Sequence, residues 1–204
     1  MKRFLSGDEA FAEGVRLARP QVISAYPITP QTVVVERLSE MVEDGSLAAE
    51  YVHVESEHSA LSCAIGASAT VRARSRPRRA GFAVHGRVPD LRGGRTVPHR
   101  DDEREPRHRA AVEHLRRPAR QPGAFGPRLG AGVRARQPGA LDLALMAYAV
   151  AEDPEVRTPF MVNLDGFALT HTYESVDIPA QEQADAFLPP YDGAGNRFDF
   201  ANPV

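Results

Sequence analysis

The sequence predicts an α/β fold with a parallel sheet, interrupted by a middle segment of different composition. Short apolar runs alternate with helical patterns in residues 1–70 and again in residues 140–204. Strands that alternate with helices are typical of a parallel sheet, because each crossover between parallel strands needs a long connection. Residues 71–139 carry an Arg- and Pro-rich pattern with neither period, so we predict an aberrant, disordered segment there. The 204 residues therefore suit one domain with an irregular middle.

Residues 1–70 are predicted to form the first part of this domain. The segment contains, in order, a helix from Gly7, a strand at 21–26, a helix at 32–42, a strand at 49–54 and a helix at 59–70. Phe11, Val15 and Ala18 share one face of the first helix. The last helix is rich in Ala, Ser and Gly, which predicts close packing against a neighbour.

Residues 140–204 are predicted to complete the same domain. A helix is expected at 141–151, with Leu141, Leu145 and Tyr148 on one face, and a strand at 159–164. After Asp177 the chain is polar and punctuated by proline. We interpret this end as the start of a linker to a missing C-terminal domain.

The composition excludes several classes of protein. Cys63 is the only cysteine, so neither a disulfide framework nor a cysteine-based metal site is expected. No apolar stretch approaches the roughly 18 residues of a membrane span. The N-terminus meets charge before any long apolar run, so no signal peptide is expected. These observations favour a cytoplasmic protein with no membrane partner.

Two strand ends carry the candidate site residues. The turn Tyr26–Pro30, YPITP, follows the first strand and holds one hydroxyl, that of Thr29, between two prolines. Proline fixes its own φ and favours extended geometry in the residue before it, so the turn presents Thr29 rigidly. Glu57 follows the second strand. Because ligands of parallel sheets bind outside the carboxyl ends of the strands, we expect both residues at one site.

The chemistry of Glu57 has two interpretations. A carboxylate at this position can hold a cofactor nitrogen through a charge-assisted hydrogen bond. Alternatively, Glu55 and Glu57 only cap the following helix, whose dipole favours acidic residues. No metal is expected on His53, Glu55 and His58, because side chains alternate in direction along a strand and no further ligands follow. His171 is expected in an ordinary polar loop.

Five stretches occur in the order AYPITPQT, VESEHSALSCAIGASAT, ALDLALMAYAVAEDPEV, PFMVNLDGFALTHTYE and FLPPY. Together they resemble the alpha subunit of 2-oxoacid:ferredoxin oxidoreductases, most closely pyruvate:ferredoxin oxidoreductase. The likeness covers about residues 5–70 and 140–204. It implies a thiamine-diphosphate-binding, transketolase-like fold whose domain holds the pyrimidine end of the cofactor. By this resemblance, Glu57 would bond the aminopyrimidine ring and Thr29 would contact the substrate.

The resemblance also implies an activity and partners. The enzyme would decarboxylate a 2-oxoacid, pyruvate in the family it resembles most, to an acyl-CoA and pass the electrons to ferredoxin. Thiamine diphosphate would be the cofactor. Its Mg²⁺ and diphosphate site and the iron-sulfur clusters would lie on partner subunits of beta, gamma and delta type. Coenzyme A and ferredoxin would be further partners.

Residues 71–139 depart from this family. They hold 18 of the 24 arginines and 8 of the 17 prolines, and with 6 acidic residues they carry +12 against −14 for the remainder. Gly, Ala, Arg and Pro make up 44 of the 69 residues. GC-rich DNA translated out of frame gives such an excess. High charge with little apolar surface also fails to offset a backbone entropy cost of roughly 1–2 kcal/mol per residue.

Shifted reading frames restore family residues across this window. From the third base of each codon, residues 71–80 can encode ARTFTATSS. From the second base, residues 99–114 can encode IVMTNVNRAIAPPWNI, and the family arginine for the substrate carboxylate then falls at Pro106. The frame changes near residues 70, 80 and 139, as three single-base deletions require. We therefore expect the chain as written to be inactive.

Two alternatives remain open. Eighteen arginines are a plausible phosphate footprint for a nucleic-acid-binding protein. However, the window has no lysine and no recognisable motif, and Phe82 and Phe125 are its only aromatic residues, so no specific nucleic acid is expected. The second alternative is a paralogue that has lost catalysis, which a turnover assay with the partner subunits would distinguish.

The nucleotide sequence across codons 70–140 tests the frameshift. We expect a second-base frame that gives Met at Asp101, Asn at Glu103 and Ile at His108. In that frame Asp101 and His108 each allow only two outcomes, and so does Glu103 when the next base is C. Restoring one base near each shift should return an open frame with the family residues. Codons that give Thr, Ser and Thr at these positions would contradict the frameshift.

Overall fold

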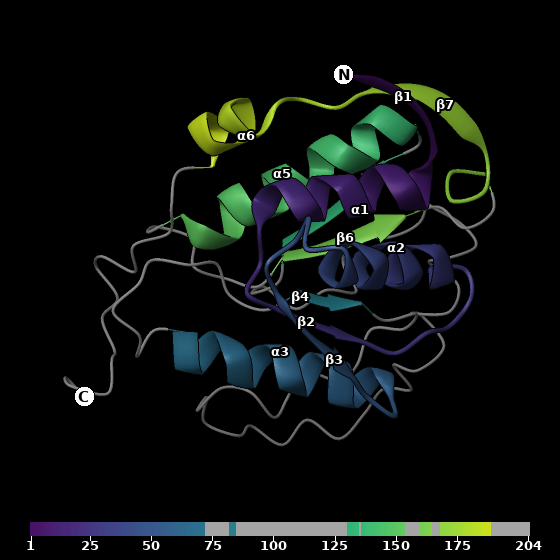
Figure 1. Cartoon of the computed structure of the whole chain (residues 1–204). Helices are drawn as coiled ribbons and strands as arrows, with labels where there is room; N and C mark the ends of the chain where they lie inside the picture. The colour runs from purple at the N-terminus through teal and green to yellow at the C-terminus, as the bar shows by residue number, and fades with distance from the viewer. Residues whose placement is uncertain (72–81, 85–129, 135, 154–159, 165–167, 189–204) are drawn as a thin grey trace, which may run out of the picture.

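The computed structural model describes residues 1–71, 82–84, 130–134, 136–153, 160–164 and 168–188 (Figure 1). The elements are β1 (Lys2–Ser6), α1 (Gly7–Ala18), β2 (Val22–Ala25), α2 (Thr32–Glu43), β3 (Glu50–His53), α3 (Glu57–Val71), β4 (Phe82–Val84), β5 (Gly130–Arg134), α5 (Gln137–Glu152), β6 (Phe160–Leu164), β7 (Tyr173–Asp177) and α6 (Gln181–Phe187). Every helix and strand predicted from the sequence is present, with small differences at the ends. The remaining elements were not predicted.

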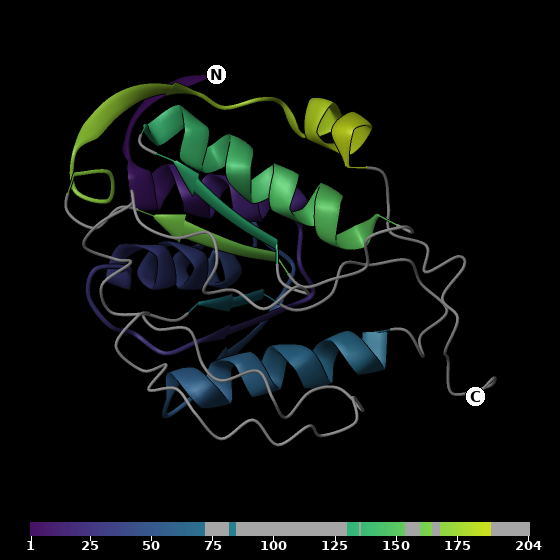
Figure 2. The same cartoon turned by 180° about the vertical axis from the view of Figure 1, so that it is seen from behind.

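β2 is the centre of a parallel sheet with the strand order β3-β2-β4. Val22 lies opposite Glu50 and Ala25 opposite His53, so β2 and β3 begin and end at the same level. α2 covers one face of this sheet and α3 the other (Figures 1 and 2). The predicted parallel α/β layer is therefore confirmed here.

β5 and β6 form a second parallel pair, with Gly130 opposite Phe160 and Arg134 opposite Leu164. α5 packs against this pair, and α1 packs along α5 (Figures 1 and 2). The two helices approach closely at Gly14. A Cβ atom added to Gly14 would lie 2.7 Å from the Ala144 Cβ and 2.8 Å from the Leu141 carbonyl oxygen.

An antiparallel ribbon of β1 and β7 joins distant parts of the chain, with Lys2 opposite Asp177 and Ser6 opposite Tyr173. The expectation of a parallel sheet alone is incomplete, because it omits this ribbon. Both strands mix charged and polar residues with a single buried face, so neither has the continuous apolar run of a buried parallel strand. α6 likewise replaces part of the polar linker expected after Asp177, while residues 189–204 lie outside the described residues.

Two clusters of buried apolar side chains hold these layers together. One lies around α1, α2 and β2 and includes Ile23 and Leu38. The other lies around β1, α1, α5 and α6 and includes Leu17 and Leu141. Burying each of these side chains contributes about 1.5–3 kcal/mol. Within the described ranges, no helix is long and apolar enough to cross a membrane.

The expectation that all of residues 71–139 lack regular structure is wrong at its described parts. β4 pairs with β2, placing Phe82 opposite Ile23, and β5 pairs with β6. Both strands consist mainly of small and apolar residues, and their ladder bonds use backbone groups that every non-proline residue supplies. α3 and α5 also reach into the window. The rest of the window, at 72–81, 85–129 and 135, lies outside the described residues.

Two helical glycines give a matched test of the α1–α5 contact. Gly14→Ala should lower the free energy of unfolding by about 1–3 kcal/mol, because its new methyl group meets the backbone of α5. Gly66→Ala in α3 should raise it by up to about 1 kcal/mol, because open space surrounds Gly66 and alanine favours helix. Urea denaturation compares the two, and equal effects would contradict the close packing at Gly14.

Candidate functional site

The carboxyl ends of β2 and β3 lie side by side and form the candidate site. Ala25 and His53 are opposite each other at the last rung of the two strands. The pairing continues one step further, because the Val54 amide donates a hydrogen bond of 3.2 Å to the Ala25 carbonyl oxygen. Thr29 and Glu57 each follow four residues after these strand ends. The prediction that both residues follow the same edge of one sheet is confirmed.

Thr29 lies in an exposed turn between β2 and α2. The Gln31 amide donates to the Ile28 carbonyl oxygen at 3.2 Å, which closes the turn around Thr29. The peptide bond between Thr29 and Pro30 is cis. Gln31 is the N-cap of α2 but makes no side-chain capping bond, and its Nε2 atom is buried without a hydrogen-bond partner in the part of the chain that the structure describes.

Glu57 is the first residue of α3, and its side chain is half-buried. The cap of this helix is Ser56, whose hydroxyl accepts the Ser59 amide at 3.1 Å and whose carbonyl oxygen accepts the Ala60 amide at 3.0 Å. Ser56, and not Glu55 or Glu57, therefore supplies the side-chain cap, while Glu57 lies in the first turn, where the helix dipole favours an acidic residue as the alternative interpretation expects. Among the described residues, the Glu57 carboxylate has no hydrogen-bond or ion-pair partner, so its oxygens are available to a ligand.

The histidines near this edge have ordinary contacts. His53 packs its ring against Tyr51, with centroids 4.9 Å apart. The carbonyl oxygen of His58 accepts the Ser62 hydroxyl at 2.8 Å. His171 lies outside the regular elements, as predicted, 2.6 Å from the Thr170 hydroxyl. In the described part of the chain, no three His, Cys, Asp or Glu residues are grouped as a metal site would require.

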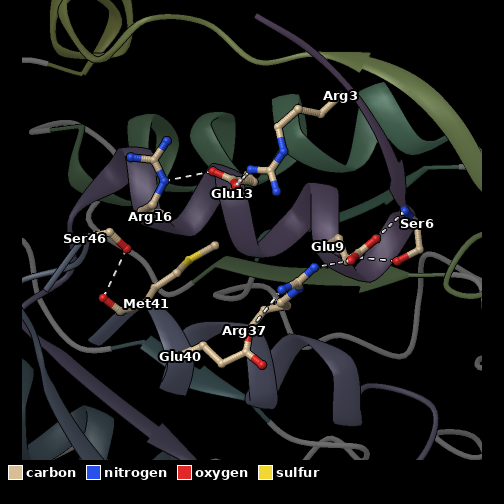
Figure 3. A network of polar contacts seen from close by, with 9 residues as sticks. All are labelled: Arg3, Ser6, Glu9, Glu13, Arg16, Arg37, Glu40, Met41 and Ser46. Atoms are coloured by element: carbon tan, nitrogen blue, oxygen red, sulfur yellow. Dashed lines mark hydrogen bonds and ion pairs between the residues drawn. The ribbon is translucent and has the colours of Figure 1, made fainter. Parts of the chain in front are cut away.

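A cavity of about 550 Å³ lies elsewhere, between α1, α2, β1 and residues 178–181. Figure 3 shows a network of polar contacts that includes several of its lining side chains. Arg3 and Arg16 both pair with Glu13, and Arg37 reaches from α2 to Glu9 at 2.6 Å. Neither Thr29 nor Glu57 lines this cavity. Because each of its arginines already pairs with a carboxylate, we assign this network to holding β1, α1 and α2 together.

Comparisons with known proteins identify the fold and the family of this chain. The fold resembles that of a 2-oxoglutarate:ferredoxin oxidoreductase from Magnetococcus marinus, solved with 2-oxoglutarate, coenzyme A and succinyl-CoA bound. The TM-score is 0.57 at 16% identity, over 89% of this chain and 32% of that chain, which concerns the fold alone. The sequence model of the family "Pyruvate flavodoxin/ferredoxin oxidoreductase, thiamine diP-bdg" matches residues 13–73 and 134–204. The chain belongs to this family.

Several relatives within the pyruvate flavodoxin/ferredoxin oxidoreductase family are curated. Pyruvate synthase subunit PorA of Methanothermobacter thermautotrophicus is 39% identical over 93% of this chain and 50% of its own length. The subunit of the same name from Pyrococcus horikoshii is 37% identical over 100% of this chain and 52% of its own length. Ketoisovalerate oxidoreductase subunit VorA of Pyrococcus abyssi is 34% identical over 100% of this chain and 51% of its own length. The chain spans about half the length of these relatives.

Sequence reasoning missed two buried polar groups on the elements that carry the candidate site. Ser24 is fully buried in β2, and its hydroxyl donates a hydrogen bond of 2.5 Å to the Ala60 carbonyl oxygen in α3. The Gln31 amide nitrogen, described above, is the other. A single hydroxyl within the apolar run Val22–Ala25 indicates a buried hydrogen-bond partner in another element. The sequence alone gave no indication of which element.

Asp8, in the first turn of α1, is the most perturbed acid among the described groups. Its side chain is fully buried, and neither carboxylate oxygen has a hydrogen-bond partner within the part of the chain that the structure describes. Burial raises the pKa of Asp8 from 3.8 to about 7, with a smaller contribution from the charge of Glu9. The folded state therefore favours the protonated acid.

This shift predicts how stability depends on pH. Between about pH 4 and 7 the folded chain binds more protons at Asp8 than the unfolded chain, so the free energy of unfolding should fall as pH rises through this range. Asp8→Asn removes the ionisation and should flatten this part of the profile. Asp142→Asn, at an exposed carboxylate of α5, is the matched control and should leave the profile as it is. Denaturant titrations at several pH values measure it, and equal profiles for the parent and Asp8→Asn would refute this assignment.

Proposed function

We propose that this chain carries the pyrimidine-binding part of a thiamine-dependent 2-oxoacid:ferredoxin oxidoreductase, with pyruvate as the 2-oxoacid. The observation that carries the proposal is the Glu57 carboxylate, which has no partner among the described residues and follows the same sheet edge as Thr29, in a chain of this family. Pyruvate is favoured because the two pyruvate synthase subunits are 39% and 37% identical, against 34% for the ketoisovalerate subunit. The products would be an acyl-CoA and reduced ferredoxin.

The residues at this edge fit thiamine diphosphate. A pyrimidine ring presents nitrogen atoms that a carboxylate can hold, and the Glu57 carboxylate has no partner among the described residues. The buried Nε2 of Gln31, next to the turn that carries Thr29, is a donor without an acceptor in the described ranges. Buried polar groups of proteins are normally paired, so an orphaned amide nitrogen at the start of α2 supports a ligand at this end of the sheet.

Each residue has a defined role in the proposal. Thiamine diphosphate, when bound, supplies the carbanion chemistry of the decarboxylation. Glu57 would accept a hydrogen bond from a protonated nitrogen of the pyrimidine ring and thereby hold the proton on that nitrogen. The Thr29 hydroxyl would donate a hydrogen bond to the 2-oxoacid and thereby orient this substrate. The hydrogen bond from the Gln31 amide to the Ile28 carbonyl oxygen closes the turn that presents this hydroxyl.

Other parts of the enzyme would lie outside this chain. The relatives are named as subunits, which supports an assembly with further chains. We place the Mg²⁺ and diphosphate site and the iron-sulfur clusters on beta-, gamma- and delta-type partner subunits. Coenzyme A and ferredoxin would meet the assembled enzyme.

We also propose that residues 71–139 are a frame-shifted segment, so that the chain as written lacks thiamine-dependent activity. The family match supports this, because it ends at residue 73 and resumes at residue 134. β4 pairs with β2 and β5 with β6 through backbone ladders, which depend little on the side chains of this window. The arginine that holds the substrate carboxylate in the family would be lost at Pro106.

Variants of the frame-restored chain, assembled with its partner subunits, test these roles. Glu57→Gln should lower kcat by at least about 100-fold, because its amide cannot take the charge that holds the ring proton. Thr29→Val should raise KM for pyruvate by roughly 3- to 10-fold, since it removes one hydrogen bond and keeps the shape. Glu55→Gln, at an exposed neighbour, is the control and should stay near the parent. Turnover of Glu57→Gln within a few-fold of the parent would contradict the role assigned to Glu57.

A further inference from the structure

Two side-chain hydrogen bonds link the central strands to the helices next to them. Each strand contributes one, and its bond reaches the helix that follows the other strand in the chain. Ser24 of β2 donates its hydroxyl to the Ala60 carbonyl oxygen of α3 at 2.5 Å. Tyr51 of β3 donates its hydroxyl to the Val35 carbonyl oxygen of α2 at 3.1 Å. α2 follows β2 along the chain, and α3 follows β3. The two bonds therefore cross between the two strand–helix units.

The pairing of the strands explains why the bonds cross. Ile23 lies opposite Tyr51, so these two side chains share one face of the sheet, and Ser24 faces the other side with Val52. α2 covers the first face and α3 the second (Figures 1 and 2). Burial raises the pKa of Tyr51 to about 12, so its hydroxyl keeps its proton and remains a donor. Ser24 is fully buried, so water does not replace its bond.

Both acceptors occupy the same place in their helices. Ala60 is the fourth residue of α3, which begins at Glu57, and Val35 is the fourth residue of α2, which begins at Thr32. A bond to the fourth residue holds the first turn of each helix against the sheet, because one turn contains 3.6 residues. The first turn of α3 carries Glu57. The first turn of α2 continues directly from the turn that carries Thr29.

Local capping does not replace these ties. Gln31 gives α2 no side-chain cap, so its start depends on contacts with other elements. Ser56 does cap α3, but it bonds only within the helix and so fixes no distance to β2. Ser24 and Tyr51 are thus the described side chains whose hydrogen bonds join the sheet to these two helix starts.

We propose that Ser24 and Tyr51 are positioning residues, which set where Glu57 and Thr29 stand relative to each other at the shared edge. This inference rests on the proposed function, in which Glu57 serves the cofactor and Thr29 serves the 2-oxoacid. Ser24 acts through α3 and therefore through Glu57. Tyr51 acts through α2 and therefore through Thr29. Removing either tie should disturb one half of the site and leave the other half in place.

The experiment compares Ser24→Ala and Tyr51→Phe in the frame-restored, assembled enzyme. Ser24→Ala should lower kcat by about tenfold or more and leave KM for pyruvate within about twofold, because a small displacement of a reacting group costs much rate. Tyr51→Phe should raise KM for pyruvate about tenfold with kcat near that of the parent. Ser24→Thr keeps the hydroxyl and should recover most of the turnover lost in Ser24→Ala.

Hydrogen exchange supplies a readout that needs no cofactor. In Ser24→Ala, amides of residues 57–64 should exchange faster, including those of Ser59 and Ala60, while residues 31–38 stay unchanged. Tyr51→Phe should show the reverse. Ser46→Ala is the matched control. The Ser46 hydroxyl also donates a hydrogen bond to a carbonyl oxygen of α2, that of Met41 at 3.2 Å, but Ser46 itself lies beyond the C-terminal end of this helix. It should change neither kinetic constant.

The outcomes separate this inference from the proposed function. If both variants lower kcat and raise KM alike, or if exchange at the two helix starts is unchanged, the positioning role is overturned. If Glu57→Gln keeps its turnover while the exchange pattern holds, the proposed function fails and the ties survive as structural bonds only. If Glu57→Gln loses turnover and Ser24→Ala does not, the inference alone is wrong.

Discussion

The in-register pairing of β2 with β3 is the constraint on which the candidate site depends. Because Ala25 lies opposite His53, the two strands release the chain at the same level, and Thr29 and Glu57 then follow at equal distance along it. A slip of one residue would turn Ser24 toward the other face and remove its acceptor. The site is therefore set by a backbone register before any side chain of the site is considered.

The buried surfaces on either side of the sheet hold this register. Ile23 belongs to the cluster that includes residues of α1 and α2, while Ser24 reaches α3 on the opposite face. One strand thus joins both layers, with an apolar contact on one side and a hydrogen bond on the other. The ion pairs of Arg37 with Glu9 and Glu40 add links between α2 and α1 and within α2, away from the strand ends.

The chemistry at the edge follows from which groups the fold leaves unpaired. The Ser56 hydroxyl supplies the side-chain cap of α3. The carboxylate of Glu57, at the first helical position, is therefore not used as a cap and can accept hydrogen bonds from a ligand. At the start of α2, the buried amide nitrogen of Gln31 has no acceptor among the residues that the structure describes. Asp8 shows the contrasting case. It is also buried and unpaired, but its carboxyl favours the protonated form, and in α1 it is not attached to either strand end.

Much of the fold and the candidate site was predictable from the sequence, because local patterns fix local structure. The apolar runs at 21–26 and 49–54, the YPITP turn and the helix patterns identified a parallel α/β layer and placed Thr29 and Glu57 at one edge. Pairings between distant residues were decided only in the tertiary structure: the ribbon of β1 with β7, the addition of β4 beside β2, and the Ser24 and Tyr51 ties. Their physical reason is common to all of them. A hydrogen bond across tens of residues depends on where the packed layers bring two groups together, and no period in the local sequence records that position.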